Sequence, residues 1–401
     1  MPRRILREED TVSESFGVYV HVPFCLGKCP YCDFVSFPLP ELGPAKRSRL
    51  VRAIVDELNL VVRDNPDLAA RFLDSIYLGG GTPSLLAPQE VRGIVDAVLR
   101  IFLPRRHAGA EPDVEITIEC NPGALPAEDL AAYRGAGVNR ISLGVQSFDP
   151  EVLRTLGRRH TPADSVDAIR NIQDVDFLSW GLDLIFGVPG TTLPQWEQDL
   201  DRAIEFKPPH ISVYGLTLHE GTVMFQRHAS GQIALPDEET QREMFLSARR
   251  KLTAAGWEHY EISNYALPGH RSRHNSIYWT LGEYLGLGVA ASSFWAGRRR
   301  SNPVSVDGYL DLVESGEYPA RLEETPSLRS TRAERIMLSL RQCEGVDLNA
   351  LNQLIGCDFR TEYEAEIRRL VDAGLLSLTK DRVSLTEEGI LLSDSVFEAF
   401  F

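Results

Sequence analysis

No run of apolar residues in the 401-residue sequence approaches the ~20 that a membrane-spanning helix needs. The opening residues "MPRRILREED" are charged and have no apolar core behind them, so we expect no secretory signal. Basic residues are also fewer than acidic ones. There are 42 Lys and Arg against 57 Asp and Glu, and the net charge of −15 argues against broad binding to nucleic acid or anionic lipid. These absences predict a cytoplasmic protein, in which cysteines stay reduced and form no disulfide framework.

Short β-rich runs alternate with longer helix-like segments along the chain, which is long enough for two domains. The expected strands are Gly17–Val22, Ser75–Leu78, Val114–Glu119, Asn139–Gly144, Leu182–Phe186 and His210–Tyr214. The expected helices are Ala45–Arg63, Pro88–Ile101, Ala127–Arg134, Pro194–Phe206 and Glu238–Ala255. Repeated strand–helix units need a parallel sheet with helices outside it. The sequence therefore predicts an α/β fold with a partial or complete (β/α) barrel.

Polar and glycine-rich positions occur where the predicted strands end. Cys25 follows the first strand, the turn Gly79–Pro83 follows the second, and Gln146 follows the fourth. Glu119 closes the third strand, and Asp183 lies in the fifth. Active sites of such barrels lie at the C-terminal ends of the strands, so this register predicts one shared site. Taken alone, each charged residue is equally compatible with an ordinary charge on the barrel rim.

Three of the six cysteines crowd into the stretch "HVPFCLGKCPYCDFVSF" at the spacing C-x3-C-x2-C. Cys25, Cys29 and Cys32 could hold three irons of a [4Fe–4S] cube and leave the fourth iron open to an exchangeable ligand. A structural zinc site usually takes four closed ligands, and the other cysteines are scattered. Three buried thiols acting as small hydrophobes are a third interpretation, which crowding on a loop with Gly and Pro disfavours.

The glycine-rich turn "GGGTPS" lets backbone N–H groups approach a carboxylate or phosphate closely. A loop that binds nucleoside triphosphate is the rival interpretation. The turn lacks the lysine of the G-x4-G-K-[ST] pattern, so triphosphate binding is disfavoured.

The C-x3-C-x2-C spacing, with an aromatic residue before the last cysteine and a later "GGGTP" turn, resembles the radical S-adenosylmethionine superfamily. The resemblance implies a [4Fe–4S] cluster on Cys25, Cys29 and Cys32, with its open iron chelated by the amino and carboxylate groups of S-adenosylmethionine. It also implies that an electron from the cluster cleaves the sulfonium and gives a 5′-deoxyadenosyl radical.

Over nearly the whole chain, the sequence is similar to the oxygen-independent coproporphyrinogen III oxidase group, and within it to the HemW haem chaperones. This resemblance implies further contacts with S-adenosylmethionine, some of which match a second nucleotide site in the decarboxylating relatives. The residues at the matching positions are Tyr19, Tyr31, Gly80, Gly81, Thr82, Glu119, Gln146, Arg158, Asp183 and Thr217.

Phe34 marks a departure from the decarboxylating oxidases. Those oxidases resemble C-x3-C-x2-C-x-C, and Phe34 stands at the position of the last cysteine. Only 24 residues precede Cys25, which leaves little room for the long N-terminal segment of the oxidases. Both departures put decarboxylation of the substrate in doubt, so a chaperone is favoured over a coproporphyrinogen oxidase.

The stretch "RHNSIYW" fits the H-N-x-x-Y-W signature of the HemW chaperones through His274, Asn275, Tyr278 and Trp279. The resemblance implies that these residues bind haem. A neutral imidazole is a common ligand of haem iron, and the two aromatic rings offer flat apolar faces to a porphyrin. Without the resemblance, a hydrogen-bonded histidine beside core aromatics would be the better interpretation.

The C-terminal part is predicted to be a small winged-helix-like α+β domain. Helices are expected at Ala333–Arg341, Asp347–Ile355 and Glu362–Ala373, and Gly374–Gly389 is expected to form a two-stranded wing. Eight Lys or Arg stand against thirteen Asp or Glu after residue 330, so a lid or partner-docking role is favoured over DNA binding. The expected organisation is a flexible segment at 1–14, a barrel at 15–268, a linker with the H-N-x-x-Y-W motif at 269–330, and this domain at 331–401.

The sequence therefore predicts a cytoplasmic protein that binds haem, a [4Fe–4S] cluster and S-adenosylmethionine, and passes haem to acceptor apoproteins. Respiratory, membrane-associated proteins are among the candidate acceptors, while nucleic acid and a transmembrane span are not expected. The alternatives are an oxygen-independent coproporphyrinogen III oxidase and a zinc-stabilised binding protein.

Overall fold

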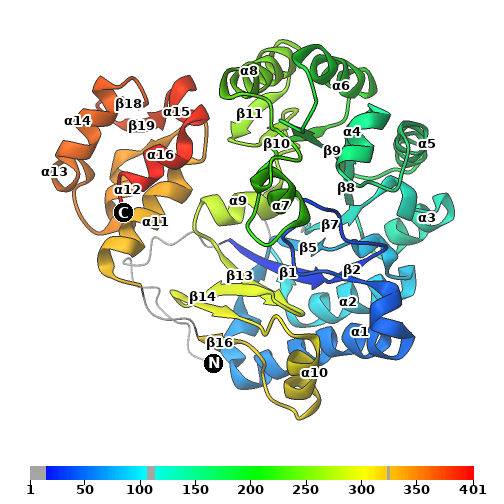
Figure 1. Ribbon diagram of the computed structural model, residues 1–401. Coiled ribbons are helices and arrows are strands. Elements are labelled where there is room, and N and C mark those ends of the chain that lie inside the picture. Colours follow the sequence, from blue (N-terminus) through cyan, green and yellow to red (C-terminus); the bar gives the residue numbers. More distant parts are fainter. Residues whose placement is uncertain (1–14, 106–112, 323–325) are drawn as a thin grey trace.

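The structure is a computed structural model that describes residues 15–105, 113–322 and 326–401 (Figure 1). Its centre is a sheet of parallel strands. These strands are β1 (Phe16–Val22), β5 (Ser75–Gly80), β7 (Glu115–Cys120), β8 (Arg140–Gln146), β9 (Ser179–Phe186), β10 (His210–Gly215) and β13 (Glu283–Leu287). They lie side by side in the order β10-β9-β8-β7-β5-β1-β13. The first six are the strands that the sequence predicted.

Antiparallel strands extend the sheet at both edges. Beyond β10 lie β12 (Asn264–Ala266) and then β11 (Glu258–Glu261). Beyond β13 lie β14 (Ser292–Trp295), β15 (Arg298–Ser301) and β16 (Arg321–Leu322). Among the described residues β11 and β16 are the outermost strands of this sheet and do not pair with each other. Glu261 of β11 forms an isolated antiparallel bridge with Gln342 in the C-terminal part. The predicted α/β fold is confirmed, and the sheet is an open, partial barrel.

Two pairs of short parallel strands and ten α-helices complete the described residues of this part of the chain. The pairs are β2 (Phe24–Cys25) with β3 (Phe37–Pro38), and β4 (Phe72–Leu73) with β6 (Leu103–Pro104). The helices are α1 (Leu39–Asp64), α2 (Pro88–Ile101), α3 (Ala127–Gly135), α4 (Pro150–Thr155), α5 (Pro162–Gln173), α6 (Leu193–Phe206), α7 (Val223–Ala229), α8 (Glu238–Ala254), α9 (Arg273–Trp279) and α10 (Val306–Glu314).

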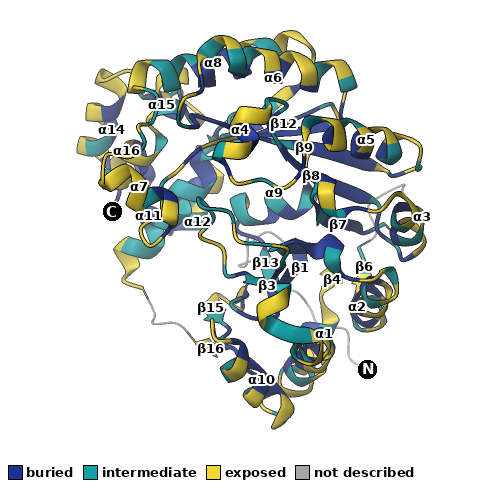
Figure 2. Ribbon diagram, turned by 45° about the vertical axis from the view of Figure 1, so that its right-hand side comes forward, coloured by how far each residue is buried: buried dark blue, intermediate teal, exposed yellow. Residues whose placement is uncertain are grey.

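Helices cover the outer face of the sheet and turn their apolar sides inward (Figures 1 and 2). In α2, Val91, Ile94 and Val98 are buried, which is the spacing of one helical face. Local signals fix the helix starts. Thr161 caps α5 by accepting a hydrogen bond from the backbone N–H of Asp164, whose carboxylate accepts in return from the backbone of Thr161.

The two faces of the parallel strands differ in chemistry, because successive side chains of a strand point to opposite sides. Apolar residues face the helices. The buried ones in β1, β5, β7 and β8 include Val18, Val20, Ile76, Leu78, Ile118 and Ile141. Polar residues face the interior, where Tyr77, Glu119, Ser142 and Asp183 line one cavity. This polar inner face supplies the groups from which a binding site can be built.

Residues 269–330, for which the sequence predicted a linker, carry α9, β13 to β16 and α10. β13 pairs in parallel with β1, from Phe16 opposite Glu283 to Val20 opposite Leu287. This segment therefore continues the central sheet, and the domain boundaries stay predictions. The predicted flexible segment at 1–14 lies outside the described residues.

The C-terminal part contains α11 (Leu328–Leu340), α12 (Leu348–Ile355), α13 (Phe359–Glu362), α14 (Glu364–Asp372), α15 (Glu387–Leu391) and α16 (Ser393–Glu398). A small sheet of β17 (Val346–Asp347), β19 (Arg382–Leu385) and β18 (Leu376–Leu378) accompanies them. The antiparallel pair of β18 and β19 lies inside the stretch predicted to be a wing. Of the helices that the structure describes, none is long and apolar enough to cross a membrane.

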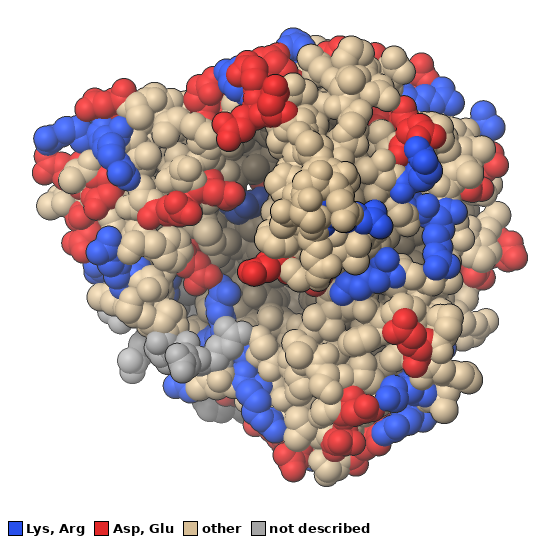
Figure 3. Space-filling view, in the orientation of Figure 1, with Lys and Arg blue, Asp and Glu red and all other residues tan. Residues whose placement is uncertain are grey.

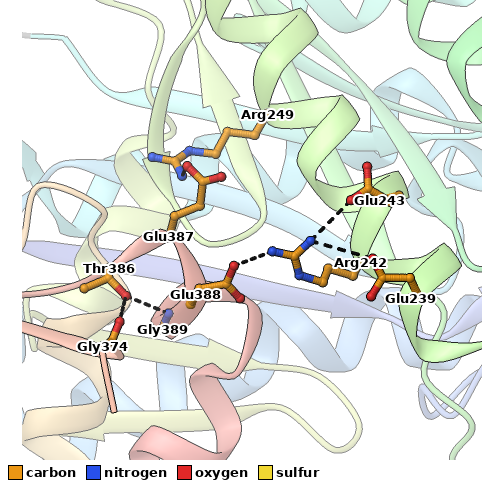
Figure 4. A network of polar contacts seen from close by, with 9 residues as sticks. All are labelled: Glu239, Arg242, Glu243, Arg249, Gly374, Thr386, Glu387, Glu388 and Gly389. Atoms are coloured by element: carbon orange, nitrogen blue, oxygen red, sulfur yellow. Dashed lines mark hydrogen bonds and ion pairs between the residues drawn. The ribbon is translucent and has the colours of Figure 1, made fainter. Parts of the chain in front are cut away.

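The face of the molecule in Figure 3 carries acidic and basic side chains interspersed, with a hollow near its centre. On this face the basic side chains form no continuous surface of the kind that nucleic acid needs. Ion pairs hold the C-terminal part to α8 (Figure 4). Arg242 pairs with Glu388, and Arg249 pairs with Glu387.

Candidate functional site

A cavity of about 480 Å³ opens at the C-terminal ends of the parallel strands. It is lined by Cys25, Cys29 and Cys32 and by nine of the ten predicted S-adenosylmethionine contacts. These nine are Tyr31, Gly80, Gly81, Thr82, Glu119, Gln146, Arg158, Asp183 and Thr217. The shared site predicted from the strand ends is therefore a single cavity.

The cysteine loop is held from two sides. The backbone N–H of Met224, at the start of α7, donates to the carbonyl of Pro30 at 2.8 Å. On the other side, a Cβ on Gly157 would stand 2.5 Å from Cδ of Pro30, so only glycine, here at φ +67°, allows this approach. Within the loop, the N–H of Cys32 donates to the carbonyl of Cys29 at 3.2 Å. These contacts fix the loop that carries the three thiols.

The three thiols suit separate irons better than one shared ion. Among the described residues, no three His, Cys, Asp or Glu side chains stand ready to hold a single metal ion. A cube presents a different iron to each thiolate, so its ligands need not converge on one point. Polar groups also approach the sulfurs: Oγ1 of Thr82 lies 3.9 Å from Sγ of Cys25, and Nη1 of Arg158 lies 4.0 Å from Sγ of Cys29. The donor set therefore fits the cluster that the sequence implies.

Glu119 is fixed at the floor of the cavity. Its Oε1 accepts from the hydroxyl of Tyr77 at 2.8 Å, and its Oε2 accepts from the backbone N–H of Gly80 at 3.0 Å. Burial raises the pKa of Glu119 to about 7, although both of these hydrogen bonds act to lower it. A ligand that donates hydrogen bonds or carries positive charge would favour the ionised carboxylate.

Asp183 and Gln146 offer further acceptors on the same inner face. Asp183 accepts from Oγ of Ser142 at 3.1 Å, and burial raises its pKa above the ordinary range. Gln146 adopts φ +67°, rare for a residue with a side chain, and its buried Oε1 has no hydrogen-bond partner among the described residues. A buried acceptor without a donor fits a cavity built for a polar ligand.

Arg158 joins three of the strand ends. Its guanidinium donates to the carbonyl of Gly144 at 2.8 Å and to the side chain of Asn121. The amide of Asn121 in turn donates to Oγ1 of Thr82 at 3.0 Å. Asn121 and Tyr77 are not among the site residues predicted from the sequence. Asn121 directly follows a predicted strand end, and Tyr77 is two positions before Gly79 on the same strand face, so strand-end position and two-residue periodicity are the signals that would have found them.

Gly81 is constrained by the neighbouring strand end as well as by the cavity. A Cβ at Gly81 would lie 2.5 Å from the carbonyl oxygen of Phe24, which is backbone and cannot easily move. Tyr19 is the one predicted contact that does not line the cavity. Its hydroxyl lies 3.0 Å from Nδ1 of His21, whose Nε2 lies 2.8 Å from the carbonyl of Val35. Tyr19 therefore supports the cysteine loop through His21.

The structure does not bring the H-N-x-x-Y-W residues into this cavity. Helix α9 lies at the opposite, N-terminal ends of the strands, where the carboxylate of Glu115 accepts from the backbone N–H groups of Arg273 and His274. His274 is fully buried, with Nδ1 2.8 Å from Oγ of Ser75 and Nε2 2.9 Å from the hydroxyl of Tyr278. Burial lowers the pKa of His274 to about 3, so the ring is neutral.

Both ring nitrogens of His274 are thus engaged, and iron ligation through Nε2 would require the Tyr278 hydroxyl to move. Trp279 is half-buried, and the guanidinium carbon of Arg341 lies 4.4 Å from its ring centroid. Asn275 is half-buried on the same helix. Their assignment to haem remains a prediction from the sequence.

Comparison with known proteins agrees with this geometry. The model of the Radical SAM superfamily matches residues 19–203, and that of the HemN C-terminal domain matches residues 329–392. The chain is 39% identical to heme chaperone HemW of Escherichia coli, over 96% of this chain and 97% of that protein. It is 33% identical to heme chaperone HemW of Lactococcus lactis, again over 96% and 97%.

Among solved structures, coproporphyrinogen III oxidase (HemN) from Escherichia coli is similar, with a TM-score of 0.79. The two chains are 22% identical, and the match covers 97% of this chain and 91% of that one. At this identity the likeness concerns the fold alone.

Proposed function

The chain belongs to the HemW family of radical SAM proteins, and on that premise we propose that it binds haem and passes it to acceptor apoproteins. The observation that carries the proposal is the single cavity that joins the three cysteines of the C-x3-C-x2-C loop to Glu119 and Asp183. The relatives named heme chaperones match this chain over almost all of its length.

The cavity is proposed to hold a [4Fe–4S] cluster together with S-adenosylmethionine. Cys25, Cys29 and Cys32 are the proposed ligands. When bound, the cluster supplies one iron open to the amino acid end of S-adenosylmethionine and a source of single electrons. Glu119 and Asp183 accept hydrogen bonds from the donors of that molecule, and each is held in place by a neighbour on the next strand.

An oxygen-independent coproporphyrinogen III oxidase is the second candidate function. It is favoured by the fold shared with HemN over 97% of this chain. Phe34, which stands where the decarboxylating oxidases have a further cysteine, counts against it. The haem chaperone is therefore the preferred proposal.

Product analysis distinguishes these two functions. The reconstituted full-length protein is incubated anaerobically with coproporphyrinogen III, S-adenosylmethionine and a low-potential reductant. The chaperone proposal predicts unchanged coproporphyrinogen III. Conversion to protoporphyrinogen IX would overturn it. A zinc-stabilised binding protein, in contrast, would contain zinc and no iron on elemental analysis.

We further propose that the protein works in the cytoplasm.

The partner is proposed to be a protein and not a nucleic acid. The charge of −15 and the interspersed charges in Figure 3 support this choice. Respiratory, membrane-associated apoproteins stay candidate acceptors.

A further inference from the structure

The mouth of the cavity presents apolar side chains to solvent. Phe34 is 62% exposed and Leu26 is 40% exposed, and both lie on the cysteine loop and line the cavity. The ammonium group of Lys28 donates to the carbonyl of Phe34 at 3.1 Å and so holds this part of the loop. Exposed apolar side chains offer contact area to an apolar ligand, and an aromatic ring such as that of Phe34 offers it a flat face.

His219 faces the same mouth from the loop that follows β10. Its Nδ1 lies 3.4 Å from Oδ2 of Asp33, the residue directly after Cys32. Its carbonyl accepts from the N–H and the hydroxyl of Thr222, at 3.1 and 2.7 Å, which fixes the backbone turn. Both side chains of the His219–Asp33 pair are about half exposed, and Nε2 of His219 has no hydrogen-bond partner among the described residues.

A carboxylate at Nδ1 is the usual support of a metal-binding histidine, because it fixes the ring and leaves Nε2 free for the metal. In His219 a carboxylate oxygen lies near Nδ1, and Nε2 has no hydrogen-bond partner among the described residues, whereas both nitrogens of His274 are already hydrogen-bonded inside the protein. Cationic groups that suit carboxylates are also near. The guanidinium of Arg159 lies over Gly27 at the cavity, and no carboxylate within the described residues forms an ion pair with it.

We infer that haem binds at the cavity mouth, with Nε2 of His219 as the axial ligand of its iron, Phe34 against the porphyrin face and Arg159 near a propionate. The inference rests on the proposed function, since it identifies where the haem would bind. The occupant is haem because the mouth combines an imidazole beside a carboxylate, exposed apolar area and a cation that has no ion pair within the described part of the chain, which match iron, porphyrin and carboxylate in turn.

The test uses anaerobically reconstituted full-length protein, titrated with haemin and followed by optical and resonance Raman spectroscopy. His219→Ala is expected to lose the histidine-ligated spectrum, and His219→Met to bind haem with a thioether spectrum instead. Asp33→Asn is expected to keep histidine ligation but to weaken haem binding by about 10-fold. His228→Ala, at another exposed histidine in the last turn of α7, is the matched control and is expected to behave as wild type.

The outcomes distinguish a failure of the proposed function from a failure of the inferred haem site. A wild-type protein that binds no haem contradicts the proposed function itself. A wild type with histidine-ligated haem, combined with an unchanged spectrum in His219→Ala, contradicts this inference alone. If His274→Ala then loses the ligand, the haem site predicted from the sequence is the correct one.

Discussion

The ring of His274 stacks on the ring of Tyr77, with centroids 5.0 Å apart and planes 25° apart. Tyr77 in turn donates its hydroxyl to Glu119 in the cavity. The H-N-x-x-Y-W motif is therefore connected to the proposed S-adenosylmethionine site by packing and one hydrogen bond, although it does not line that site. This connection gives the motif a structural contribution that is independent of haem.

Replacing any one of Cys25, Cys29 and Cys32 with alanine is expected to abolish the cluster, since each would leave one iron of the cube without its thiolate. The measurement is iron and sulfide content with the optical spectrum after anaerobic reconstitution. Alanine at each of the other three cysteines provides matched controls that should keep the cluster. A normal [4Fe–4S] spectrum from Cys29→Ala would contradict the ligand assignment.

Affinity for S-adenosylmethionine is expected to fall as the pH drops below about 7, because Glu119, whose pKa is about 7, then becomes protonated and is a poorer acceptor. Above that pH the carboxylate is ionised and the affinity should be nearly constant. Glu119→Gln should weaken binding at high pH and remove most of this pH dependence. Calorimetry between pH 6 and 8 measures the effect, with exposed Glu128→Gln as the control. An identical pH profile in Glu119→Gln would refute this role.

Glu57 is a fully buried carboxylate that joins three distant parts of the chain. It accepts from the N–H of Gly288 at 2.7 Å, from the amide of Asn302 at 2.7 Å and from the hydroxyl of Tyr309 at 2.8 Å. Glu57→Ala leaves three buried donors without an acceptor and should lower the free energy of unfolding by about 3 kcal/mol or more. Asp56→Ala, at the exposed neighbour, is the control in urea denaturation. Equal losses in the two variants would contradict this prediction.

Glu57 also predicts a pH dependence of stability. Burial raises its folded-state pKa from 4.5 to about 7, so the folded protein holds this proton more tightly than the unfolded chain. The contribution is complete below about pH 4.5 and is lost as the pH rises to about 7. The free energy of unfolding of wild type relative to Glu57→Gln should therefore fall over this window. If the free energy of unfolding of wild type relative to Glu57→Gln rose with pH, the prediction would be wrong.

Two arginines join the C-terminal part to the rest of the chain, and replacing them with alanine should lower the free energy of unfolding by different amounts. Arg341 lies 3.4 Å from the fully buried Glu261 and packs on Trp279, so Arg341→Ala leaves a buried carboxylate unpaired and should cost about 3 kcal/mol. Arg242 pairs with Glu388 at the surface (Figure 4), and Arg242→Ala should cost much less. Urea denaturation and hydrogen exchange in α11 measure both effects. A larger loss from Arg242→Ala would contradict this ranking.

Much of the sheet could be predicted because its strands carry strong local signals. In "SIYLGGGTP", apolar and polar residues alternate and glycines mark the end. β15, in contrast, contains Arg298, Arg299 and Arg300 and has no apolar alternation. It is a strand because it pairs with β14 and β16 near the edge of the sheet, where its arginine side chains are exposed or half-buried. Such tertiary pairing is invisible to a local pattern.

The cavity was predictable for a different reason. Residues at the ends of neighbouring parallel strands must come together, so Glu119 and Asp183 could be assigned to one site from the strand order. The environment of His274 could not be predicted from the strand order, because its contacts with Ser75 and Tyr278 depend on how α9 packs against the sheet. The pairing of Asp33 with His219 joins residues 186 positions apart and likewise needs the fold.

The proposed function depends above all on the binding of haem as cargo. Its most direct test is an anaerobic haem titration of the full-length protein, with its cluster and as the cluster-free Cys29→Ala variant, followed by optical spectroscopy. We expect the cluster-loaded wild type to bind haem saturably, with the spectrum of a histidine-bound iron. Haem absorbance that rises linearly without saturation, with the spectrum of unbound haemin, would contradict it.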